Sequence, residues 1–169
     1  MQKNLKSAAQ RARLPALLVA SWLSLSIVAN AADETASPTP FDGPSSSVQV
    51  LEPLALQGNA VAQFNLGVLH DVGRGVWQDH VAAASWYRLA AKQGHAAAQF
   101  NLGGLYFEGL GVPKDLVRAS VWFTLSATAG FDGATRNRNS VATLLTADQI
   151  AAVQQLARAC RQNSFADCD

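Results

Sequence analysis

This chain of 169 residues has few charged side chains and very few cysteines. Only 15% of its residues are Asp, Glu, Lys or Arg, and no run of basic residues follows the N-terminal segment. A basic surface is what most nucleic-acid-binding proteins require, so we do not expect nucleic acid as a partner. The three histidines share no i, i+3 or i, i+4 spacing and no Cys-x-x-Cys accompanies them, so we expect no metal site and no cofactor.

Sequence signatures of enzymes are also missing. Ser-x-x-Lys and Gly-x-Ser-x-Gly, which mark two classes of serine hydrolase, do not occur. The glycine pairs Gly73-x-Gly75 and Gly109-x-Gly111 lack the third glycine and the preceding strand of a phosphate-binding loop. We therefore expect a non-enzymatic protein without catalytic residues.

One long apolar segment is present, at the N-terminus. Basic residues come first, Leu14–Val28 is then mostly apolar, and Ala29–Ala31 has the small-x-small pattern of a cleavage site. This order predicts a signal peptide over residues 1–31, cleaved after Ala31 or nearby. A membrane anchor is the alternative, but the apolar run of about 15 residues is shorter than the about 20 that a span needs. We expect an exported protein, periplasmic or secreted, without stable membrane insertion after cleavage.

Export changes the balance of charge. Of the 13 Lys and Arg residues, four precede Ala31, so nine remain against twelve Asp and Glu and the formal charge becomes −3.

A segment occurs twice at an offset of 36 residues without a gap. Gly58–Gly94 aligns with Gly94–Gly130, and about half of the aligned positions are identical. A period between about 20 and 50 residues is typical of repeat architectures. We therefore expect two structural repeats, at residues 59–94 and 95–130.

Each repeat predicts two helices. In the first copy one helix covers Ala60–Val72, because apolar residues recur at spacings of three and four and Gly73 can end it. Asp79 is a suitable N-cap for a second helix over His80–Gln93. We expect the apolar face of that second helix to consist of Trp86, Leu89 and Ala90.

Gly67 and Gly103 lie inside the first helices, where glycine costs about 1 kcal/mol relative to alanine. We expect Trp86 and Trp122 to occupy the space that these glycines leave.

The segments around the repeats predict a leader and two ends. Residues 32–47 are rich in Pro and Ser and predict a flexible leader. Residues 48–58 align with the end of a repeat and predict an N-terminal half-repeat, in which Pro53 either starts a short helix or bends a longer one. Residues 131–169 predict a helix over Ala134–Leu144, a second helix after the capping box Thr146–Gln149, and a tail.

The two cysteines, Cys160 and Cys168, lie close to the C-terminus. In an exported chain we expect a disulfide between them, worth about 2–3 kcal/mol by loop entropy. The alternative, a free buried Cys160 and a Cys168 loose in the tail, stays open.

The repeated pattern resembles the Sel1-like repeat. Ala-x-Ala-Gln-x-x-Leu-Gly-x-Leu, Gly-x-Gly-Val-x-x-Asp and Trp-Tyr/Phe recur in register over Leu51–Gly130, and Phe131–Arg161 is similar to the capping helices of bacterial members. This chain departs from the family pattern at His70, where the family usually has an aromatic residue, and at Trp77, where it usually has a proline. The resemblance implies an all-α fold of six or seven helices, namely a short α/α superhelical solenoid related to tetratricopeptide repeats, with C-terminal capping helices.

We expect recognition where the two copies differ, because what they share is explained by helix capping and packing. The differing pairs are His70/Tyr106, Asp71/Phe107, Val72/Glu108 and Arg74/Leu110. Asn65 and Asn101 recur, which favours hydrogen bonding between repeats over ligand recognition. Trp77, Phe107 and Phe131 are aromatic residues near helix ends, either binding anchors or packed under their own loops. The candidate binding residues are His70, Asp71, Arg74, Trp77, Tyr106, Phe107 and Glu108.

The family resemblance implies protein–protein scaffolding, often in the cell envelope. We expect a module that holds a partner protein or peptide of the bacterial envelope in a shallow concave groove. Two alternatives stay open. One is a secreted enzyme of β-lactamase or penicillin-binding type, since some cysteine-rich secreted members are linked to β-lactams. The other is a structural subunit of an envelope or polysaccharide-export assembly. The sequence does not specify the partner or the oligomeric state.

Overall fold

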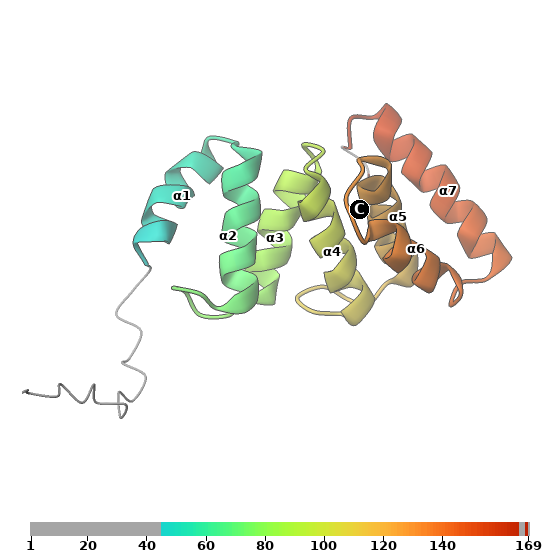
Figure 1. Cartoon of the computed structure of the whole chain (residues 1–169), viewed down its shortest axis with the longest axis horizontal. Helices are drawn as coiled ribbons and strands as arrows, with labels where there is room; N and C mark the ends of the chain where they lie inside the picture. Colours follow the sequence, from blue (N-terminus) through green and yellow to red (C-terminus); the bar gives the residue numbers. More distant parts are fainter. Residues whose placement is uncertain (1–44, 166–167, 169) are drawn as a thin grey trace, which may run out of the picture. The chain divides into compact units, whose positions relative to one another are not determined.

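The computed structural model describes residues 45–165 and 168, so the predicted signal peptide and residues 32–44 of the leader lie outside the described part. Seven α-helices and no strands make up the described residues, which confirms the all-α prediction (Figure 1). None of these helices is both long and apolar enough to cross a membrane. The helices are α1 (Ser46–Leu56), α2 (Ala60–Val72), α3 (His80–Ala91), α4 (Ala96–Glu108), α5 (Leu116–Thr128), α6 (Ala134–Ala142) and α7 (Ala147–Gln162).

The helices pack in chain order. Each of α1 to α5 contacts the next one along the chain, and α5 also contacts both α6 and α7. This succession of antiparallel neighbours is an α/α solenoid, as expected. The last helix, α7, lies against α5 and buries Val153, Ala157 and Cys160 in the core.

Helix ends recur with the repeat. Asp79 and Asp115 accept backbone hydrogen bonds at the starts of α3 and α5. Asn59 accepts the corresponding bond at the start of α2, and His95 accepts it through Nδ1 at the start of α4. Burial lowers the pKa of His95, which favours the neutral ring that this acceptor role requires.

Close contacts between glycine and aromatic rings hold the two helices of each repeat together. A Cβ on Gly67 would lie 2.5 Å from the Tyr87 ring, and one on Gly103 would lie 3.0 Å from the Phe123 ring. The prediction that Trp86 and Trp122 fill this space is therefore wrong by one residue. The predicted apolar face of α3 is also wrong in part, because Tyr87 is 1% exposed and Ala90 is buried whereas Leu89 is 47% exposed.

Some predicted boundaries are wrong by a few residues. The first helix begins at Ser46, so Ser46 and Ser47 belong to α1 and not to the leader. Val48 is buried, and the Ser45 N–H donates to the Gly75 carbonyl, which ties this start to the loop after α2. Pro53 lies inside α1, on an exposed position. Two other helices end two residues early, α3 at Ala91 and α6 at Ala142.

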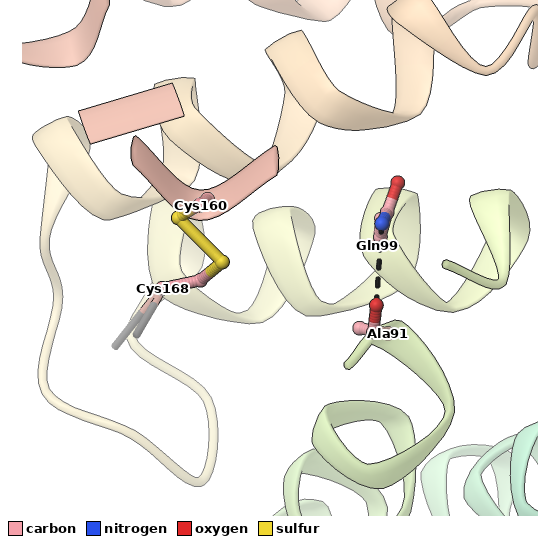
Figure 2. Close-up of a disulfide and its surroundings, with 4 residues drawn as sticks. All are labelled: Ala91, Gln99, Cys160 and Cys168. Carbon is pink, nitrogen blue, oxygen red and sulfur yellow. Dashed lines mark hydrogen bonds between the residues drawn. A yellow bond between two sulfur atoms is a disulfide. The ribbon is translucent and has the colours of Figure 1, made fainter. Parts of the chain in front are cut away.

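Two buried glutamines connect successive elements. The Nε2 group of Gln63 donates to the Ala55 carbonyl. In the same way the Nε2 group of Gln99 donates to the Ala91 carbonyl (Figure 2). Gln93 then donates to Oε1 of Gln63 at 2.7 Å, whereas the residue at the corresponding position of the second repeat is Ala129. Among the described residues Oε1 of Gln99 has no donor, so the second repeat lacks one bond of the first.

The C-terminal tail is fastened beside these helices. Cys160, on α7, and Cys168 form a disulfide, and both residues are buried (Figure 2). The Phe165 ring packs on Gly94, at the turn between α3 and α4. The tail is thus connected to the repeats as well as to α7.

Adjacent glycines on α4 allow a test of the glycine–aromatic contact. We expect Gly103→Ala to lower the free energy of unfolding by about 1–3 kcal/mol, because its Cβ would meet Phe123 and the Ala119 carbonyl. Nothing lies within 4 Å of a Cβ on Gly104. We therefore expect Gly104→Ala to raise the stability by about 0.5–1 kcal/mol. Thermal unfolding of the two variants checks this pair, and equal effects at both positions would contradict it.

Candidate binding groove

Two hollows lie on either side of α4. The first, which we call the acidic hollow, has a volume of about 180 Å³ and lies between α2 and α4. The second, which we call the apolar hollow, has a volume of about 220 Å³ and lies between α4 and α6, with Phe123 of α5 among its lining residues. Gly104 and Glu108 line both, so the two hollows adjoin across α4.

The two hollows occupy the same structural position one repeat apart. The acidic hollow is lined on its α4 side by Asn101, Gly104, Leu105 and Glu108. The apolar hollow is lined on its α6 side by Asn137, Ser140, Val141 and Leu144, which are the residues 36 positions later. A larger hollow of about 370 Å³ lies between α5 and α7, outside this repeated arrangement.

The chemistry of this position reverses between the copies. On one wall Asp71 in the acidic hollow corresponds to Phe107 in the apolar hollow, and on the other wall Glu108 corresponds to Leu144. Each carboxylate is thus matched by a large apolar side chain one repeat further on. The substitutions leave the helices in place and change only what the hollow presents.

A hydrogen-bonded network fixes the Asp71 carboxylate. The Tyr87 hydroxyl donates to its Oδ2 at 3.1 Å, and Nδ1 of His80 lies 2.9 Å from its Oδ1. The Asn101 side chain, on α4, acts on the Tyr87 hydroxyl from the second repeat and tends to lower the pKa of Tyr87. Burial and then the neighbouring Asp71 charge raise the pKa of Tyr87 above its ordinary value, which keeps the hydroxyl protonated. In the second copy Phe107, Leu116 and Phe123 replace Asp71, His80 and Tyr87, and the network is absent there.

The pattern of the Sel1 repeat matches residues 60–95 and 96–131. A solved protective antigen of uropathogenic Escherichia coli strains, which displays a Sel1-like repeat fold, is 38% identical with a TM-score of 0.65. A solved Sel1 repeat protein from Oxalobacter formigenes is 39% identical with a TM-score of 0.52. The chain is a Sel1-like repeat protein. Such repeats indicate a scaffold fold for protein–protein interaction.

These solved relatives are longer than this Sel1-like repeat protein. The similarity to the antigen covers 70% of this chain and 27% of the antigen, and that to the Oxalobacter protein covers 53% of this chain and 37% of that protein. Among curated proteins none matches the chain. The shared part therefore describes the repeat unit and not the activity of a whole protein.

The candidate residues named from the sequence fall into three groups. Asp71, Phe107 and Glu108 line the two hollows. Arg74 and Trp77 lie in the loop between α2 and α3 and line neither hollow, although Trp77 is 73% exposed. The other two lie within the helices, His70 half-buried with an Nδ1 that has no partner among described residues, and Tyr106 buried with its hydroxyl accepting from Arg88.

Several lining residues were not named from the sequence. Gly104, the α6 residues Asn137 and Ser140, and Leu144 just after α6 belong to this set. Gly104 carried a signal in the sequence, because Val68 stands at the same position of the first repeat and the two copies therefore differ there. The α6 residues carried a weaker signal, since the repeat pattern degrades after Gly130. Metal binding has no evident site, as no three His, Cys, Asp or Glu side chains gather among the described residues.

The two tyrosines of the chain provide a test of the Asp71 network. In an alkaline titration followed at 295 nm we expect Tyr87 to ionise above the ordinary tyrosine pKa of about 10. Tyr87→Phe should remove this late step, and Asp71→Asn should move it to lower pH. Because folding raises the pKa of Tyr87, its protonated hydroxyl contributes to the stability of the fold, fully below about pH 10. This contribution is lost as the pH rises towards the pKa of the folded state. A late step that persists in Tyr87→Phe would assign it to Tyr106 instead.

Proposed function

We propose that this protein is a non-enzymatic interaction module that binds a segment of a partner protein in the groove formed by the acidic hollow and the apolar hollow. The observation that carries the proposal is the recurrence of a hollow at the same repeat position on both sides of α4. The scaffold fold of Sel1 repeats supports it. The small size of the groove favours a short segment over a long wrapped ligand.

We further propose that the module acts in the bacterial cell envelope. The basic, apolar and small-x-small order of residues 1–31 supports export. The disulfide between Cys160 and Cys168 supports an oxidising compartment such as the periplasm.

Site-specific photo-crosslinking tests the binding face. We expect a crosslinking amino acid at Leu144, which is 59% exposed at the apolar hollow, to capture a partner in the cells that produce the protein. The same amino acid at Leu56, on α1 and 73% exposed, is the matched control and should capture none. Equal capture at both positions, or none at either, would contradict the proposed face.

Export is tested by the mass of the protein recovered from cells that express the full chain. We expect a periplasmic or secreted product whose N-terminus is Ala32, because the signal peptide is removed after Ala31. Replacing Ala29 and Ala31 with bulky residues should leave the uncleaved chain in the membrane fraction. Recovery of the uncleaved wild-type chain from the cytoplasm would overturn this part of the proposal.

A further inference from the structure

We infer that the partner segment binds in extended form across α4, with a basic side chain in the acidic hollow and a large apolar side chain in the apolar hollow. This inference rests on the proposed function and specifies the chemistry of the partner.

The acidic hollow favours a cation. Asp71 and Glu108 line it, and none of its other lining residues carries a charge. The Asp71 side chain is 26% exposed and is held by Tyr87 and His80, so its orientation is set before a partner arrives. A lysine or arginine of the partner would form charge-assisted hydrogen bonds there, whereas an acidic residue would be repelled.

The apolar hollow favours a large uncharged side chain. Phe107, Phe123, Val141 and Leu144 contribute to its walls, and their apolar surface would leave water when a leucine or an aromatic residue enters. Glu108 lines this hollow as well, but its carboxylate would already pair with a cation bound in the acidic hollow, and Nζ of Lys114 lies 5.5 Å from the centre of the Phe107 ring. The second anchor therefore meets mainly apolar side chains, and we expect the two hollows to select different side chains.

Gly104 forms the passage between the hollows. Glycine inside a helix costs about 1 kcal/mol relative to alanine, and for Gly67 and Gly103 the nearby rings of Tyr87 and Phe123 explain that cost. No atom lies within 4 Å of a Cβ placed on Gly104, so packing within the described chain does not explain this residue. A backbone that crosses α4 between the hollows would use the open space, which accounts for glycine at this position.

The dimensions of α4 set the spacing of the two anchors. A helix with its side chains is about 10–12 Å wide. An extended chain advances about 3.3 Å per residue. The basic and the apolar residue of the partner should therefore be about three or four positions apart.

Selection from a displayed library of random peptides tests the inference, with the protein purified after expression of the full chain as the target. We expect the selected peptides to share one Lys or Arg and one large apolar residue at this spacing. Their synthetic versions should bind about tenfold more weakly to Glu108→Gln, because one charged contact is lost. Glu52→Gln, the same change on an exposed position of α1, is the matched control and should bind like the wild type.

Two further variants separate the apolar anchor and the passage. Phe107→Ala should weaken the same peptides by about tenfold or more. Gly104→Ala should weaken them as well, although its melting temperature stays equal to or above that of the wild type. This combination distinguishes a blocked passage from a damaged fold.

The possible failures are distinguishable. Selected peptides that are acidic or lack a charge, or equal binding by Glu108→Gln and Glu52→Gln, would overturn the two-anchor inference and leave the interaction module intact. Unchanged binding by Gly104→Ala would exclude the passage across α4. No enrichment of any peptide, together with no crosslinked partner at Leu144, would overturn both the inference and the proposed function.

Discussion

The close approach of a glycine to an aromatic ring is the contact on which the rest of this structure depends. Gly67 faces Tyr87 and Gly103 faces Phe123, and in each repeat the missing side chain lets two helices pack around one ring. A glycine inside a helix is unfavourable by itself, so burial of the aromatic ring has to offset its free-energy cost. Since both copies use it, the two helix pairs have the same geometry and the hollows beside α4 recur at the same positions.

That shared geometry lets a few substitutions change what the protein presents without changing its fold. Phe123 stands in the second repeat where Tyr87 stands in the first. The ring still packs against its glycine, and only the hydroxyl is missing. The hydroxyl matters where Asp71 needs a donor, and it is dispensable where Phe107 stands instead. Polarity in this groove is therefore decided by side chains that the packing tolerates in either form.

The C-terminal end of the array differs from a further repeat in its hydrogen bonds and in its last helix. Gln99 lacks the second bond that Gln93 provides to Gln63, and the array does not continue with a third full repeat. In its place α7 covers α5, and the disulfide holds the tail against the same core. A closed end of this kind stops the addition of further repeats.

From the sequence alone, the duplicated pattern and its resemblance to the Sel1-like repeat predicted the all-α solenoid, and local signals predicted the cap at Asp79 and most helix boundaries. It also pointed to Asp71, Phe107 and Glu108 as positions where the copies differ. Only the tertiary structure decided which ring faces each glycine and that Tyr106 is buried. It also decided that Gly104 lies open between two hollows, since each of these depends on how neighbouring helices pack on one another, which local sequence signals do not specify.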